Sequence, residues 1–166
     1  PISGAFGLPF GQPLSDDVIT KPLGWMSTDV PGEWDYKGSV PYRMDSYVVR
    51  PPGVPRLLRD LGGRYLVRTN FEGHPIWITA TLNLTADQFG QVGAVLQRMY
   101  QKVDGFYTDG VHRVELTQAG EVTRLTYLDV TAFDAYMARR NVTLERKFKE
   151  PPGGWGLSMT ERQIIS

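Results

Sequence analysis

The fold is decided by residues 76–103, which read IWITATLNLTADQFGQVGAVLQRMYQKV. In residues 76–84 of this stretch, apolar side chains alternate with Trp77 and with polar side chains. A period of two is typical of a β-strand that has one buried face and one exposed face. The alternation therefore predicts a strand over residues 76–84, with its isoleucine and leucine side chains directed into the core.

The second part of the stretch changes to the period of a helix. Thr85 is a suitable N-cap, and Gln88 takes the third position of a capping box. Apolar side chains then recur three and four residues apart, which predicts one apolar stripe on a helix of about 18 residues. The stripe consists of Phe89, Val92, Leu96, Met99 and Val103. We expect Gly105 to end the helix, and Gly90 and Gly93 to mark a close approach of the helix to the sheet.

Strands flank this stretch on both sides. Residues 64–71 predict a strand that pairs with residues 76–84 across a turn containing glycine and proline. A second hairpin is predicted from residues 111–117 and 122–130, and Thr131 is expected to cap a short helix after it. The order ββαββα predicts an α+β fold, in which an antiparallel sheet built from hairpins carries helices on one face.

The length of 166 residues favours a single domain, here an α+β domain over residues 1–166. Residues 1–60 are rich in glycine and proline and predict a loop-rich N-terminal part. Within it, Ser15 is expected to begin a helix of about two turns, which Pro22 limits. Residues 143–166 are expected to form an extended tail, because a polar stretch leads into an end rich in proline and glycine.

The composition narrows the functional classes. The chain has 18 basic and 18 acidic residues. It therefore lacks the basic excess that neutralises a phosphate backbone, and we expect no nucleic-acid binding. The absence of cysteine rules out disulfides and thiolate metal sites. No apolar run approaches the roughly 20 residues of a membrane span, and no motif indicates a cofactor.

Residues for catalysis are scattered along the chain. The two histidines, His74 and His112, do not form a metal-binding motif, so we expect no metal site. A triad of Ser46, His112 and Asp109 is one arrangement that the residue types leave open for a hydrolase. Asp104 and Asp109 are a second arrangement, as paired carboxylates. Because no motif selects either arrangement, we predict no catalytic residue.

Aromatic residues give the strongest indication of a binding surface. Trp25, Trp34 and Tyr36 fall in the irregular N-terminal part, and Trp77 falls on the polar face of its strand. Aromatic side chains in loops are frequent anchors of protein interfaces. The alternative is that these rings fill a core that the short elements leave open.

The connection between the long helix and the next strand is a second candidate surface. It contains Asp104, Tyr107 and Asp109, and we expect this acidic connection to enter a partner's cleft. Alanine at Asp109 and Tyr107 is accordingly expected to weaken partner binding while leaving the melting temperature nearly unchanged.

The N-terminal sequence resembles that of a known group of proteins. The segment FGLPFG at residues 6–11, followed by Leu14, Ser15 and Val18, is similar to the opening of many small bacterial envelope proteins. The succession of hairpin, long helix and closing hairpin resembles BamE-like and β-lactamase-inhibitor-like proteins. This resemblance implies an exported protein that binds another protein without catalysis, such as an assembly factor, an enzyme inhibitor or a toxin-immunity protein.

We therefore predict a non-catalytic, exported protein that binds a protein partner, with an inhibitor or immunity role as the specific form. One alternative is a hydrolase whose site is assembled from scattered Asp and His residues. Another is a structural or assembly component of an envelope or phage complex. The expected location is periplasmic or secreted, with the cytoplasm as the alternative, and the sequence leaves the oligomeric state open.

Overall fold

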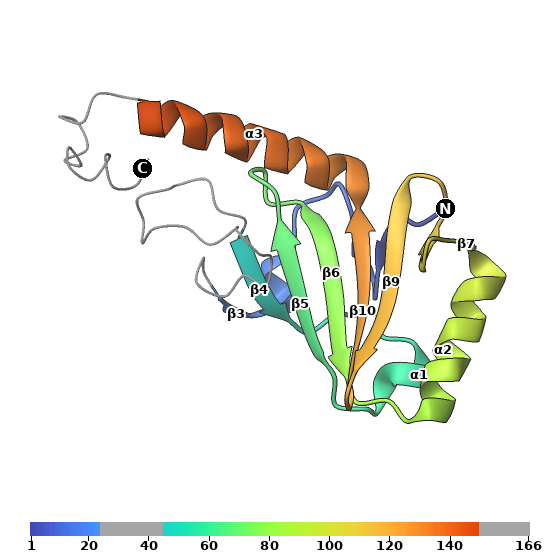
Figure 1. Ribbon diagram of the computed structural model, residues 1–166. Coiled ribbons are helices and arrows are strands. Elements are labelled where there is room, and N and C mark those ends of the chain that lie inside the picture. The colour runs from blue at the N-terminus through green and yellow to red at the C-terminus, as the bar shows by residue number, and fades with distance from the viewer. Residues whose placement is uncertain (24–44, 150–166) are drawn as a thin grey trace.

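The computed structural model describes residues 1–23 and 45–149. Within them, eight strands form one antiparallel sheet in the order β3-β4-β5-β6-β10-β9-β8-β7 (Figure 1). The strands are β3 (Ile19–Pro22), β4 (Asp45–Val49), β5 (Arg64–Thr69), β6 (Pro75–Leu82), β7 (Gln101–Val103), β8 (Phe106–Thr108), β9 (His112–Ala119) and β10 (Val122–Asp129). The α+β class and the ββαββα core built from hairpins are confirmed.

The centre of the sheet has the predicted alternation. Ile76, Ile78, Leu82 and Leu84 are all buried, whereas Trp77 on the other face of β6 is half-buried. β6 lies between β5 and β10, so each of its faces can pack against a different layer.

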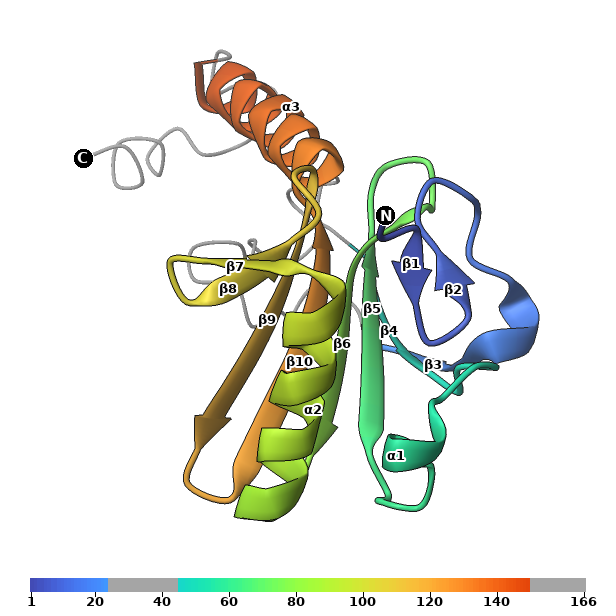
Figure 2. The same ribbon diagram turned by 90° about the vertical axis from the view of Figure 1, so that its right-hand side faces the viewer.

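One face of the sheet carries most of the core. Figure 2 shows α2 (Ala86–Met99), α1 (Arg56–Arg59) and the small hairpin of β1 (Gly4–Ala5) and β2 (Leu8–Pro9) against this face. Side chains from all of these elements join one hydrophobic cluster with the sheet. Its buried members include Ile2, Phe6, Leu8, Leu58, Val67, Ile78, Val92, Leu96, Val114 and Leu125. The N-terminal segment is thus part of the core, although it was predicted only as loop.

The long helix begins as predicted but ends earlier than predicted. The capping box of Thr85 and Gln88 is confirmed. The C-terminal end was predicted wrongly, because α2 stops at Met99, Tyr100 is extended, and Met99 is 61% exposed. Residues 101–108 instead form the β7–β8 hairpin, whose turn residues Asp104 and Gly105 have φ angles of 48° and 85°. An Asp-Gly pair in this left-handed conformation is typical of a tight β-turn and not of a helix C-cap.

The last helix is longer than the sequence predicted. α3 runs over Val130–Lys149 and crosses the end of the sheet (Figure 1). Residues 143–149 are therefore helical and not part of an extended tail, while residues 150–166 lie outside the described residues. Good helix formers such as Leu, Glu, Arg and Lys dominate 144–149, and no proline occurs before Pro151. The carboxylate of Asp129, and not Thr131, accepts the hydrogen bond from the first turn, at Ala132 N.

The N-terminal part holds more short elements than expected. The helix predicted at Ser15 is a single 3-10 turn, η1 (Asp16–Val18), in which the Ser15 hydroxyl accepts a hydrogen bond from Asp17 N. It stops at once because Ile19 enters β3, whose pairing with β4 satisfies the backbone instead.

Candidate functional site

The predicted binding residues are dispersed over the molecule. Trp25, Trp34 and Tyr36 lie outside the described residues. Trp77 lies on the sheet face opposite α2, where its ring packs between two neighbours. The Arg68 guanidinium carbon lies 4.8 Å from the Trp77 ring centroid, and the Phe133 ring meets it edge-on at 6.0 Å. These contacts describe a packed residue, in agreement with the alternative that tryptophan fills the core.

Asp109 holds the N-terminal segment on the sheet. Its Oδ2 accepts hydrogen bonds from Ile2 N at 2.7 Å and from His112 Nδ1 at 3.1 Å. Its Oδ1 accepts from Val111 N at 2.9 Å and from His112 N at 2.7 Å. Burial disfavours the charged carboxylate, but these hydrogen bonds outweigh burial and hold the pKa of Asp109 well below its usual range. The side chain is only 10% exposed, so the structure uses it for internal bonding.

The histidine beside Asp109 is also part of the packing. The His112 ring stacks on Phe10 with 5.5 Å between centroids and 2° between planes. Ser46, the third member of the triad considered above, lies on β4 and on the opposite face of the sheet. Four strand spacings separate β4 from β9, or roughly 19 Å. The structure therefore does not bring the triad together.

The described ranges 1–23 and 45–149 also contain no metal-binding cluster. No group of three or more His, Asp or Glu side chains there is placed to hold a metal ion.

Burial, together with the nearby Tyr100, raises the pKa of Tyr127 to about 12, so that this phenol stays protonated at neutral pH. None of the helices in these ranges is long and apolar enough to cross a membrane.

A groove lies between α2, the β7–β8 hairpin and β9. It has a volume of about 290 Å³ and is lined by Phe89, Gly90, Gly93, Ala94, Gln97, Lys102, Gly105, Tyr107 and Leu116. The small side chains of α2 leave the space open. A Cβ added at Gly93 would lie 3.7 Å from the Tyr107 hydroxyl oxygen and 3.8 Å from Leu116 Cδ2. These are ordinary van der Waals distances, and a Cβ at Gly90 would meet nothing within 4 Å, so neither glycine is required by the close approach of helix and sheet that the sequence predicted.

The exposed surface of the groove is polar and apolar in equal parts, with Gln97, Lys102 and Tyr107 beside Phe89, Ala94 and Leu116. Among the described residues of its lining, Lys102 alone is charged, and its Nζ lies 5.6 Å from the centroid of the Tyr107 ring. Two apolar side chains on the opposite side of α2 are exposed, Val95 at 36% and Met99 at 61%. A hollow of this mixed character, with a cation at Lys102, suits a peptide segment that carries an apolar side chain beside polar groups.

Two of the predicted residues belong to this groove or border it. Tyr107 is 6% exposed and forms part of the groove lining, and Asp104 is exposed at the tip of the hairpin beside Gly105. Sequence analysis missed the groove itself, although the pair of glycines in α2 was its signal. Both Tyr107 and Asp109 are largely buried, so alanine at either position is now expected to lower the melting temperature, contrary to the expectation from the sequence.

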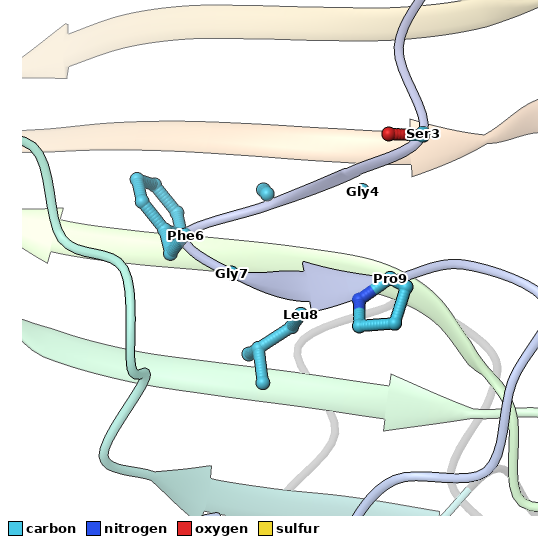
Figure 3. A pocket seen from close by; sticks show the side chains of 7 residues that line it. Ser3, Gly4, Phe6, Gly7, Leu8 and Pro9 are labelled. Atoms are coloured by element: carbon cyan, nitrogen blue, oxygen red, sulfur yellow. The ribbon is translucent and has the colours of Figure 1, made fainter.

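A second hollow occurs beside the N-terminal hairpin (Figure 3). It has a volume of about 400 Å³ and is lined by the consecutive residues 3–9. Phe6 and Leu8 are buried in the core, so the hairpin offers mainly backbone to this hollow. It contains no titratable side chain, and we regard the α2 groove as the candidate site.

Comparison with known protein families, curated proteins and solved structures found no match to this chain.

Proposed function

We propose that this chain is a non-catalytic protein-binding protein whose recognition surface is the α2 groove. The observation that carries the proposal is the groove lining, in which apolar and aromatic side chains lie beside three glycines, Gln97 and a cation at Lys102. Interface anchors are typically large apolar side chains that enter pockets of this kind. The resemblance of residues 6–18 to exported envelope proteins supports a periplasmic or secreted location and an inhibitor or immunity role.

The surroundings of the groove support a protein partner. α2 carries only two charged residues in 14, Asp87 and Arg98. Val95 and Met99 are also exposed, but at 100° per residue they lie on the side of α2 away from the groove lining. Depletion of charge at the centre of a patch is the compositional mark of a protein interface.

Photo-cross-linking from the groove tests the proposal. A photoreactive residue at Gln97, in the groove lining, is expected to capture a specific protein in cells that produce the chain, whereas the same residue at exposed Glu72 is not. Gly93→Leu fills the groove and should reduce capture at least tenfold. Gln91→Leu, on an exposed part of α2 outside the lining, should leave capture unchanged.

A melting curve for each variant shows whether it is folded. Capture that persists in folded Gly93→Leu, or that is equal from Gln97 and Glu72, contradicts a recognition role for the groove.

A further inference from the structure

We propose that the partner binds as an extended segment, which adds a strand to the outer edge of β9 below the β7–β8 hairpin. This inference rests on the proposed function of the α2 groove and specifies the form of the ligand. Addition of a strand to an open sheet edge is a recurrent mode of peptide recognition, in which backbone hydrogen bonds give affinity and side-chain pockets give specificity.

The outer edge of β9 is only partly covered. In the described part of the chain, β8 pairs with β9 at Arg113 and Val114 and no further, although β9 continues to Ala119. Figure 2 shows no strand on the outer side of the lower half of β9. Residues 117–119 are exposed and Leu116 is half-buried, as expected for an edge that no other strand covers.

The hairpin geometry identifies which backbone groups face outward. Ala119 and Val122 flank a two-residue turn that has Gly120 at a φ of 65°, so these two residues form a hydrogen-bonded pair. Because such pairs alternate along an antiparallel ladder, Thr117 also bonds to β10. Leu116 and Gln118 then direct their backbone N–H and C=O groups away from β10.

The other two edges of the sheet carry features that discourage pairing. β3 contains Lys21 and Pro22 and an irregularity in its register with β4. β7 has three residues with Lys102 at its centre. Charges, proline and bulges are the usual protection of edge strands. The open stretch of β9, residues 116–119, contains neither charge nor proline.

The position of this edge favours a single extended chain over a second copy of the protein. β8 and β7 lie outside β9, so the open stretch is recessed by two strand spacings, or roughly 10 Å. The sheet edge of another folded copy meets the β7–β8 hairpin before it reaches β9. An extended segment of another protein enters the recess without this obstacle.

The groove supplies the specificity. Leu116 and Gln118 are on the face of β9 that carries α2, because residues two apart share a face. Side chains of an added strand on this same face point into the space between β9 and α2. The lining accepts an apolar side chain, and Lys102, its single charge, selects an acidic neighbour in the same segment.

A random twelve-residue peptide library, selected on the full chain, tests the inference. We expect enrichment of peptides in which an apolar residue alternates with polar ones and an acidic residue lies nearby. These peptides should bind Gln118→Pro at least tenfold more weakly than Gln118→Ala, since proline removes the outward N–H and keeps the β9–β10 ladder. Binding should also slow hydrogen exchange of the Leu116 and Gln118 amides in the unchanged protein at least tenfold.

The outcomes separate this inference from the proposed function. One outcome is that Gly93→Leu weakens peptide binding, Gln118→Pro does not, and hydrogen exchange at Leu116 and Gln118 stays unchanged. This outcome overturns strand addition and supports the groove as the binding site. If the peptides bind both variants as tightly as the unchanged protein, strand addition and the groove are both overturned. If no peptide is enriched, strand addition is overturned and cross-linking from Gln97 decides the proposed function alone. Should Gln118→Pro not fold, the exchange rates in the unchanged protein decide the question.

Discussion

At the scale of single residues, Asp109 shows how an acidic side chain in a turn can be structural. The two oxygens of its carboxylate accept four hydrogen bonds from the chain itself, which is the full capacity of the group. Asp-Gly-Val-His at residues 109–112 indicates this role, because an aspartate before such a turn bonds to the backbone N–H groups just after it. The bond to Ile2 was beyond sequence analysis, because it joins residues 107 positions apart.

We predict that Asp109→Asn lowers the free energy of unfolding by about 2 kcal/mol at pH 7, since the amide nitrogen or a weaker acceptor replaces a charged oxygen at Ile2 N. Folding lowers the pKa of the carboxyl from its ordinary value of 3.8. The stabilisation is therefore fully present above about pH 4 and is lost as the pH falls further, through the lower pKa of the folded state. Urea unfolding from pH 7 to pH 3 measures this difference. A difference that stays constant to pH 3 contradicts the assignment.

At the scale of elements, the strongly periodic segments could be predicted and the short ones could not. The alternation of residues 76–84 and the cap of α2 follow from local sequence, and both are confirmed. The end of α2 was misplaced because Val103 continues the apolar stripe in phase. The Asp-Gly pair at 104–105, followed by aromatic residues, instead indicates a hairpin. Residues 101–103 pair with β8, and β8 pairs with β9, which stabilises the hairpin over a longer helix.

Gly90 gives a prediction for α2 as an element. Glycine inside a helix costs about 1 kcal/mol relative to alanine. A Cβ at this position would meet nothing within 4 Å, so Gly90→Ala is free of steric cost. We expect the melting temperature to rise by about 2 to 4 °C. Differential scanning calorimetry of the two proteins measures the shift, and an unchanged or lower melting temperature contradicts it.

At the scale of the whole molecule, local sequence determines which strands form hairpins but not how the outer strands attach. The recess at β9 arises because β7 and β8 are short and β9 is long, a mismatch that has no local sequence signature. The N-terminal hairpin was likewise predicted as loop, since its strands have two residues each and are held by the core and not by their own ladder. The candidate site lies beside the β7–β8 hairpin, whose attachment to β9 could not be predicted from the sequence.

Removal of residues 1–10 is expected to abolish cooperative unfolding. The deletion takes Ile2, Phe6 and Leu8 out of the core. At about 2 kcal/mol for each buried side chain, the loss approaches the whole stability of an ordinary domain. Fluorescence of a dye that binds exposed apolar surface should increase, and the sharp thermal transition should disappear. Removal of exposed Pro1 alone is the matched control, and a cooperative transition after the longer deletion contradicts the role of this segment.

The bond between Ile2 and Asp109 also bears on how the protein is made. Ile2 is synthesised before Asp109, and 107 further positions must be translated before the acceptor of this hydrogen bond exists. At 5 to 20 residues per second, the apolar N-terminal residues wait roughly 5 to 20 s without their place in the core. During that interval Phe6 and Leu8 lack the later strands that bury them, so this part of the core closes only after Asp109 has been added.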